Sequence, residues 1–245
     1  MKPKLYRTEK LILVKKIIGT PTENNEFMIE RIKSVHLDEQ FRYKNRYFID
    51  HIYEDIKTGD IVLDCGKCSR HFFQKIRDKA SLLETLDVFD FGPYPDILCD
   101  LCQPLEDTEI RGRYDRIICL AVMEHCYDPF AAARNLFYML KEGGTLYGYV
   151  PWLFRYHAPD KLNFQDYMRF SRDSLAYIFR DASELTLYPM HGPLTAALHQ
   201  VIPAKLSKKL DERPKLAAWL DRQISNPQWA QQCSGYAFVA RKQGA

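Results

Sequence analysis

Short apolar runs alternate along the chain with longer segments in which apolar residues recur every three or four positions. Runs of this length that stay almost wholly apolar are typical of strands buried on both faces of a sheet, and the second spacing is typical of helices. Strand-then-helix alternation predicts an α/β protein with one mostly parallel sheet and helices on both of its faces. The predicted strands are 60–65, 81–89, 95–101, 114–122, 143–150, 184–190 and 235–242, and the main predicted helices are 46–56, 69–78, 128–141 and 171–182.

The pattern changes near both ends of this alternation. Residues 1–45 carry only short mixed patterns, and we expect them to form a cap segment before a domain that spans 46–245. The aromatic, irregular stretch 152–170 predicts a loop or lid, and Ser171 is placed to cap the helix that follows it. A helical insertion is expected at 194–230, between the last two strands.

Composition and charge limit the class of protein. The net charge of +3 is small and mixed in sign along the chain, which argues against a nucleic-acid partner. No apolar run approaches the roughly 18 residues of a membrane span, and no signal-peptide core is found, so we expect a cytoplasmic protein. The insertion is basic and amphipathic, and either contacts an anionic membrane surface or forms a solvated cap over a pocket.

Acidic residues stand at the ends of three successive predicted strands. Asp64, Cys65 and Gly66 form the first turn, where a glycine allows a ligand to approach the backbone closely. Asp87 ends the second strand at the spacing expected of a residue that binds a ribose diol. Asp100 ends the third strand and could accept a hydrogen bond from an adenine amine. The absence of G-x-G-x-x-G after the first strand argues against a nicotinamide-dependent dehydrogenase.

These segments together resemble a known family. "IVLDCGKCSR" is similar to a motif with an acidic residue and alternating glycines, and "YDRIICLAVMEHCYDPFAAARNLFYMLKEGGTLYGYVPW" is the most specific match. The sequence resembles the class I S-adenosylmethionine-dependent methyltransferases over roughly 45–190 and the last strand. The resemblance implies a Rossmann-like, seven-stranded sheet with an antiparallel C-terminal hairpin, and S-adenosyl-L-methionine as cofactor. It implies these cofactor-binding residues: Asp64, Cys65, Gly66, Asp87, Val88, Asp100, Leu101, Leu120 and His125.

One segment resembles a subgroup that often modifies sugars and surface-glycan precursors. "RYHAPDKLNFQDYMRFSRDSL" carries the resemblance, with Met168 in place of the subgroup's usual Trp. The resemblance implies a hydroxyl of a small molecule as acceptor, namely that of a sugar or glycan precursor. Cys68 and Arg70 depart from the family's second and third glycines, which leaves open a non-catalytic, methyltransferase-like binding protein with a degenerate cofactor loop.

A hydroxyl nucleophile needs a base, ideally one whose pKa is near 7. His157 follows the fifth predicted strand at the expected rim of the pocket and is the first candidate, the alternative being a surface-loop histidine without a role. Asp166, Tyr167 and Arg169 are candidates for shaping the acceptor site, the alternative being a structural join in which Arg169 pairs with an acid.

The cysteines raise the question of a metal. Two C-x-x-C pairs, Cys65 with Cys68 and Cys99 with Cys102, would normally indicate zinc. The second predicted strand runs between the two pairs, so we expect small buried thiols at the strand ends and no metal, with zinc as the alternative.

Overall fold

In the computed structural model, most of the chain folds around one β-sheet. The chain divides into two compact units, Met1–Ser34 and Val35–Ala245. Most of the expected cap segment therefore falls in the first unit, of which only a few residues are described, whereas residues 35–45 belong to the unit that holds the sheet. The described residues are 30–31, 34–43, 45–66, 70–158, 164–224 and 231–244.

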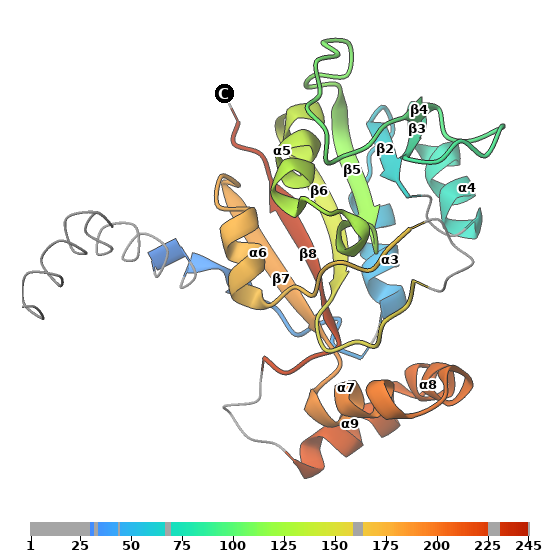
Figure 1. Ribbon diagram of the computed structural model, residues 1–245, viewed down its shortest axis with the longest axis vertical. Helices are drawn as coiled ribbons and strands as arrows, with labels where there is room; N and C mark the ends of the chain where they lie inside the picture. The colour runs from blue at the N-terminus through green and yellow to red at the C-terminus, as the bar shows by residue number, and fades with distance from the viewer. Residues whose placement is uncertain are drawn as a thin grey trace, which may run out of the picture. The chain divides into compact units, whose positions relative to one another are not determined.

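The described part of the second unit contains one eight-stranded sheet (Figure 1). Its strands are β1 (His36–Leu37), β2 (Ile61–Cys65), β3 (Leu82–Asp87), β4 (Ile97–Leu98), β5 (Tyr114–Leu120), β6 (Leu140–Pro151), β7 (Glu184–Met190) and β8 (Gly235–Arg241). They lie in the order β1-β7-β8-β6-β5-β2-β3-β4. All pairs are parallel except those of β8 with β6 and with β7, which confirms the mostly parallel sheet and the antiparallel hairpin.

The sheet has one strand more than the seven expected. β1 consists of two residues that pair in parallel with Thr186 and Leu187 of β7 at the sheet edge. So short a strand shows no alternation of apolar and polar residues, because alternation needs about four residues to be seen.

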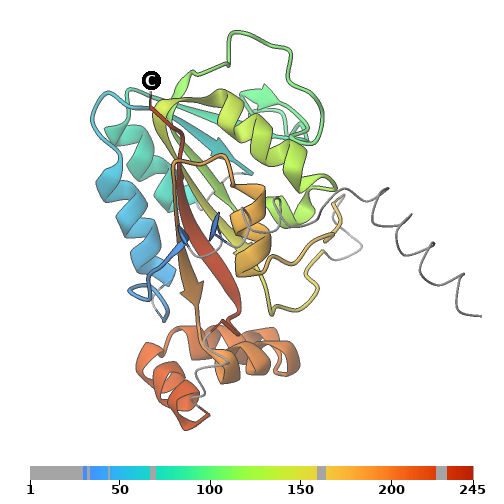
Figure 2. The same cartoon turned by 90° about the vertical axis from the view of Figure 1, so that its left-hand side faces the viewer.

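Helices cover both faces of the sheet, as Figures 1 and 2 show. They are α3 (Asn45–Asp55), α4 (Arg70–Lys79), α5 (Pro129–Met139), α6 (Arg172–Ile178), α7 (Pro193–Val201), α8 (Ala204–Asp211), α9 (Pro214–Gln223) and the short 3₁₀ helix η1 (Met123–His125). α3 and α4 lie on one face and α5 and α6 on the other (Figure 2). Ser171 caps α6 as predicted, since its side chain accepts a hydrogen bond from the backbone N–H of Ser174.

The insertion between β7 and β8 consists of α7, α8 and α9, which gather beyond the end of the sheet where β7 finishes (Figures 1 and 2). Residues 225–230 of the predicted insertion lie outside the described part. Among the described helices, none has the length and the apolar character that crossing a membrane requires.

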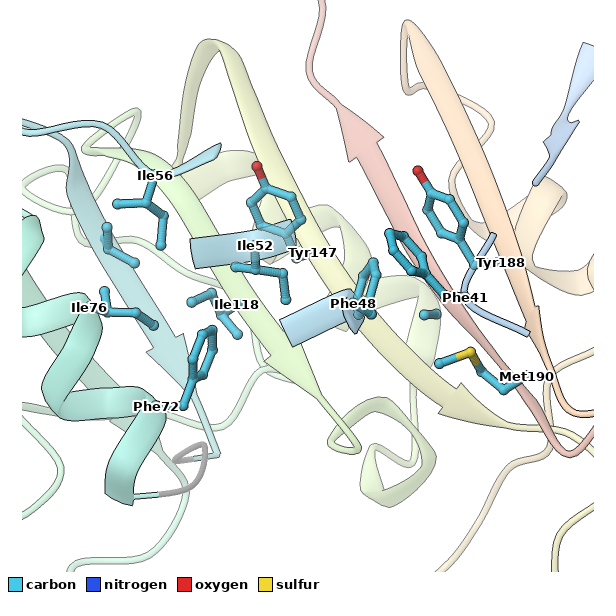
Figure 3. Close-up of a cluster of buried hydrophobic side chains, with 12 residues drawn as sticks. Phe41, Phe48, Ile52, Ile56, Phe72, Ile76, Ile118, Tyr147, Tyr188 and Met190 are labelled. Atoms are coloured by element: carbon cyan, nitrogen blue, oxygen red, sulfur yellow. The ribbon is translucent and has the colours of Figure 1, made fainter. Parts of the chain in front are cut away.

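The core on one face of the sheet follows from the helical spacing (Figure 3). Phe48, Ile52 and Ile56 stand four positions apart, so they face the same side, and at most 2% of each is exposed. They pack with Ile76 of α4 and with Ile118 of β5. The core therefore fixes α3 and α4 against the central strands.

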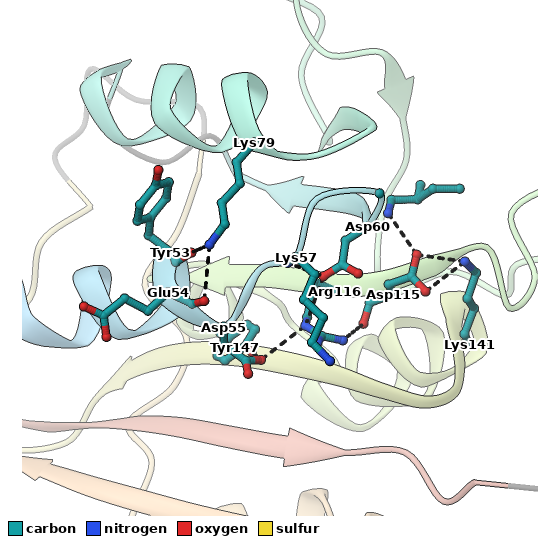
Figure 4. A network of polar contacts seen from close by, with 12 residues as sticks. Tyr53, Glu54, Asp55, Lys57, Asp60, Lys79, Asp115, Arg116, Lys141 and Tyr147 are labelled. Atoms are coloured by element: carbon teal, nitrogen blue, oxygen red, sulfur yellow. Dashed lines mark hydrogen bonds and ion pairs between the residues drawn. The ribbon is translucent and has the colours of Figure 1, made fainter.

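A polar network holds the amino ends of the central strands (Figure 4). The Asp115 carboxylate accepts hydrogen bonds from the Ile61 backbone N–H at 2.9 Å and from Lys141 Nζ at 2.8 Å. Arg116 forms an ion pair with Asp55 at 3.2 Å, and Asp55 also accepts from the Tyr147 hydroxyl. These contacts fasten β2, β5 and β6 at one edge and leave the opposite, carboxyl edge free for a site.

Candidate functional site

A cavity opens at the carboxyl ends of the parallel strands, where ligands bind in sheets of this kind. It has two adjoining lobes of about 210 and 520 Å³, and the larger is of the size typical for small-molecule sites. Gly66 after β2, Asp87 at the end of β3 and Val122 after β5 line both lobes. Asp100, two residues beyond β4, lines the smaller lobe, so neighbouring strand ends contribute to one cavity.

The turn after β2 approaches Val122 so closely that only glycine fits at residue 66. Gly66 has a φ of +74°, and its N–H donates to the Leu86 carbonyl at 2.9 Å. A Cβ at this position would lie 2.4 Å from Cγ2 of Val122. Of the two departures from the family's glycines, Cys68 lies outside the described residues, and Arg70 is described only as the first backbone residue of α4.

Two tyrosine hydroxyls orient the carboxylates of the cavity. Asp87 Oδ2 accepts from the Tyr94 hydroxyl at 2.8 Å and Oδ1 from the Phe89 N–H at 3.1 Å. Asp100 likewise accepts from the Tyr127 hydroxyl at 3.0 Å. Burial and the Asp87 carboxylate both raise the pKa of Tyr94, so its hydroxyl stays a donor. Each carboxylate oxygen keeps a further lone pair that a ligand hydroxyl or amine could use.

Six of the nine predicted cofactor residues line this cavity, and three do not. Asp64 and Cys65 lie within β2 and are fully buried beneath the turn, with exposed fractions of 0% and 1%. Leu120 packs against the hydrophobic core. Strand residues point alternately to the two faces of the sheet, so the last residues of a strand need not face the space beyond its end. The six that line the cavity are Gly66, Asp87, Val88, Asp100, Leu101 and His125.

Among the described residues, His125 is the histidine whose side chain lines the cavity. η1 places it, and its Nδ1 lies 2.6 Å from the Gln165 carbonyl oxygen, which can only accept, so Nδ1 carries the proton. Its Nε2 therefore has a free lone pair when the ring is neutral. The ring also contacts Phe164 at a centroid distance of 4.4 Å.

His157, the base expected from the sequence, does not line the cavity but lies behind His125, with ring centroids 5.1 Å apart. Its Nδ1 is 3.1 Å from Asp166 and its Nε2 is 3.4 Å from Oε1 of Glu124. Glu124 is wholly buried, and its carboxylate has no aligned hydrogen bond within the described residues. Glu124, followed by Asp166, raises the pKa of His157 despite partial burial.

The other predicted acceptor-site residues divide between the cavity wall and the rest of the predicted lid, 152–170. Tyr167 lines the smaller lobe and is half exposed. Asp166 and Arg169 do not line either lobe; they pair with each other, and Arg169 also donates to the carbonyls of Phe154 and Arg155. Arg169 holds the pKa of Asp166 below its usual range. This pair therefore ties 166–169 to 154–155, and Arg169 is paired with an acid as in the structural alternative; the acceptor-site role of both residues stays a prediction.

The backbone of the lid is also tied to the loop after β5. The N–H groups of Tyr167 and Met168 both donate to the Glu124 carbonyl, at 2.8 and 3.2 Å. Residues 159–163 of the predicted lid are outside the described part. Glu124 and Tyr94 are site residues that sequence reasoning missed. Glu124 precedes His125 in the segment "MEHCYDP", but nothing in its spacing indicates burial.

The cysteines show no metal geometry in the described part of the chain. Cys99 and Cys102 line the smaller lobe, whereas Cys65 is buried beside Cys119. Two groups of described residues have ligand atoms within 4.8 Å of one another, and neither contains a cysteine. They are Glu124 with His125 and His157, and His191 with His199 and Asp211.

Solved structures of methyltransferases share the fold of this chain, although no family model and no curated protein matches the sequence. A SAM-dependent methyltransferase from Archaeoglobus fulgidus aligns with a TM-score of 0.51 and 14% identity, over 82% of this chain and 94% of its own. The Haemonchus contortus phosphoethanolamine N-methyltransferase 2, in complex with phosphomonomethylethanolamine and S-adenosylhomocysteine, aligns with a TM-score of 0.51 and 13% identity. That alignment covers 91% of this chain and 58% of the other. The chain therefore has the fold of the S-adenosylmethionine-dependent methyltransferases.

Proposed function

We propose that this protein is an S-adenosylmethionine-dependent methyltransferase that acts on a hydroxyl of a small acceptor. The observation that carries the proposal is the convergence of Gly66, Asp87 and Asp100 on one cavity, from three neighbouring strand ends. Each has the chemistry that one part of the cofactor requires. A fold alone would not bring these three residue types to the same edge in this order.

The residues of the cavity fit the cofactor. Asp87 offers two carboxylate oxygens to the two hydroxyls of a ribose, and Tyr94 and the Phe89 N–H hold it in place. Asp100 can accept from an adenine amine beside the buried side chain of Leu101. Gly66 has no side chain and lines both lobes, so a ligand can approach the backbone of the turn closely.

When bound, the cofactor supplies a methyl group on a sulfonium, which is transferred by in-line displacement. The protein's contribution is to align the two reactants, which can supply several kcal/mol. Phe164 and Tyr167 of the predicted lid line the cavity, where a closed lid would exclude water from the reacting groups. The remaining requirement is a base for the proton of the acceptor hydroxyl.

His125 is the residue best placed to take that proton. Its Nε2 has a free lone pair because Nδ1 donates to the Gln165 carbonyl. The resulting imidazolium would lie 4.0 Å from the buried Glu124 carboxylate, whose charge stabilises it. His157 acts behind it as a positioning residue, because both of its ring nitrogens face carboxylates.

The sugar or glycan-precursor acceptor is supported by the sequence resemblance of 155–175 and by the half-exposed Tyr167 in the cavity wall. The Tyr167 ring offers a flat apolar face, and its hydroxyl can exchange hydrogen bonds with an acceptor that carries several hydroxyl groups. Tyr127 serves the cofactor instead, because its hydroxyl already donates to Asp100 and accepts from Gln103.

The test is a calorimetric titration of chelator-treated protein with S-adenosylhomocysteine, for the natural chain and for Asp87→Asn. Asp87→Asn should bind at least about tenfold more weakly, because hydrogen bonds to a charged group are worth roughly 1.5–3 kcal/mol each. The matched control is Asp90→Asn. Asp90 is exposed three residues further on and does not line the cavity, so its variant should bind as the natural chain does.

The outcomes separate the proposal from its alternative. Binding that depends on Asp87, followed by S-adenosylhomocysteine formation from the methyl donor and a sugar-type alcohol, supports the methyltransferase. Binding without turnover on any hydroxyl acceptor supports the non-catalytic binding protein. No binding up to millimolar ligand, or full affinity of a folded Asp87→Asn variant, would contradict the cofactor assignment.

A further inference from the structure

Three polar side chains converge at the base of the helical insertion, away from the cavity. His191 directly follows β7, His199 lies on α7 and Asp211 ends α8. Oδ1 of Asp211 lies 3.3 Å from His191 Nε2 and 2.9 Å from His199 Nε2. The two imidazole rings lie nearly perpendicular, with centroids 4.8 Å apart. Two ring nitrogens therefore point at one carboxylate oxygen.

The hydrogen bonds around His191 fix its tautomer. The Ser234 hydroxyl donates to the Met190 carbonyl at 2.9 Å, so its oxygen must accept from Nδ1–H of His191, 2.8 Å away. Nε2 of the neutral ring then carries a lone pair and faces the Asp211 carboxylate. Two acceptors face each other at this distance only when a positive charge lies between them.

A proton on His199 would not resolve the arrangement. Both nitrogens of His199 are buried, and neither forms an aligned hydrogen bond within the described residues, although Nε2 is so close to Asp211. A proton between His199 and Asp211 would still leave His191 Nε2 directed at the same oxygen. One cation placed between the three atoms would satisfy all of them.

The spacing is close to that of a metal site. Tetrahedral Zn²⁺ with bonds of about 2.0–2.2 Å holds neighbouring donor atoms roughly 3.3–3.6 Å apart. The His191–Asp211 distance of 3.3 Å fits this range, and the His199–Asp211 distance of 2.9 Å would have to lengthen by about 0.4 Å. We propose that His191, His199 and Asp211 form a divalent-metal site, with Zn²⁺ as the best-matching ion and a fourth position open to water. A hydrogen bond from the second nitrogen of a ligand histidine, such as that of His191 to Ser234, is the usual support of such a site.

The backbone and the surroundings suit a built site. His191 has a φ of +60°, an unfavourable conformation for a residue with a Cβ, and it directs the ring toward the insertion. His191 and His199 are almost completely buried, whereas the side chain of Asp211 is 36% exposed and gives an ion a path of entry. The ion would join the end of β7 to α7 and α8.

A second carboxylate, that of Asp221, fixes α9 to the same region of the insertion by hydrogen bonds. Asp221 on α9 accepts from the backbone N–H groups of Gly192 and Thr195 at 2.9 and 2.8 Å. α9 is thus fixed to the start of α7 by hydrogen bonds, and the metal would do the same for α8. The proposed site serves the stability of the insertion and does not depend on methyl transfer.

The experiment titrates chelator-treated full-length protein with Zn²⁺ and, for spectroscopy, with Co²⁺. We expect one equivalent of Zn²⁺ at the site, and Co²⁺ should give the visible bands of tetrahedral nitrogen and oxygen ligation without a thiolate charge-transfer band. At a hundredfold excess of Zn²⁺ over the Kd, the Tm should rise by about 5 °C or more. Binding should weaken at least about tenfold in His199→Gln and in Asp211→Asn.

The control variant is His125→Gln, which alters the other convergent group of histidines and should leave this Zn²⁺ site intact. Asp211 is partly exposed, so Asp211→Asn keeps the test valid should His199→Gln fail to fold. Absence of binding in the natural chain would overturn the proposal. So would loss of the site's ion in His125→Gln, full affinity in Asp211→Asn, or a thiolate band, since these outcomes assign the metal to Glu124 or to cysteines.

Discussion

Replacing Gly66 by alanine tests the cofactor turn in two separable ways. Gly66 has a φ of +74°, and a Cβ there would lie 2.4 Å from Cγ2 of Val122. Gly143 has the same φ of +74°, yet a Cβ there would meet nothing within 4 Å. Gly143→Ala therefore carries the cost of the backbone conformation alone, and Gly66→Ala carries the same cost with a steric clash added.

The expected magnitudes follow from these contacts. The left-handed conformation costs an alanine roughly 1–2 kcal/mol in either variant. At Gly66 the contact adds about 1–3 kcal/mol, because Val122 is β-branched and cannot easily rotate away. We expect Gly66→Ala to lower the free energy of unfolding by roughly 2–5 kcal/mol, and the Tm by about 2–4 °C per kcal/mol.

Urea unfolding and titration with S-adenosylhomocysteine measure the two consequences. Gly66→Ala should also lose affinity for the ligand, whereas Gly143→Ala should keep it. The double variant Gly66→Ala/Val122→Ala should recover part of the stability, since the opposing methyl group is gone. Equal destabilisation of the two single variants, or unchanged affinity in Gly66→Ala, would refute this account of the turn.

Two further predictions concern charge. Because Glu124 is the main cause of the raised pKa of His157, stability gained from His157 protonation is present below its ordinary pKa of about 6.5 and is lost as the pH rises through the raised value. Glu124→Gln should lower the pKa of His157 in an NMR titration and flatten this loss; an unchanged pKa would count against the pairing. Burial alone would raise the pKa of Asp115, but the Ile61 N–H and Lys141 outweigh burial and lower this pKa. The stability that the Asp115 carboxylate contributes is therefore present above its ordinary pKa and is lost as the pH falls through the lowered value. Asp115→Asn should cost about 1–3 kcal/mol near pH 7 and much less near pH 3 in urea unfolding, and an equal cost at both would contradict the ion pair.

The sequence predicted the fold well because strand and helix periods are local properties. The seven predicted strands and the cap of α6 at Ser171 were confirmed, since each rests on apolar spacing or on one capping residue, although β4 keeps only two residues of the predicted 95–101. β1 was missed because His36 and Leu37 do not belong to an apolar run, unlike the two residues of β4. Its place in the sheet depends on pairing with β7, which is a tertiary contact.

The site was harder to predict than the fold. Asp87 and Asp100 were placed at the cavity because strand ends fix them, but no period tells which loop histidine faces inward. His125 and His157 lie 32 positions apart in the sequence, and the burial of Glu124 between them depends on how the lid folds back. The same holds for His191, which the sequence did not single out.

The position of β8 between β6 and β7 sets an order on synthesis at the ribosome. β7 is complete at Met190, yet its antiparallel partner β8 begins only at Gly235, after α7, α8 and α9. At about 5–20 residues per second, β7 waits a few seconds with this side unpaired. The insertion must therefore be synthesised before the sheet can close. Slow synthesis of the insertion would leave the unpaired apolar edge of β7 accessible to chaperones for longer.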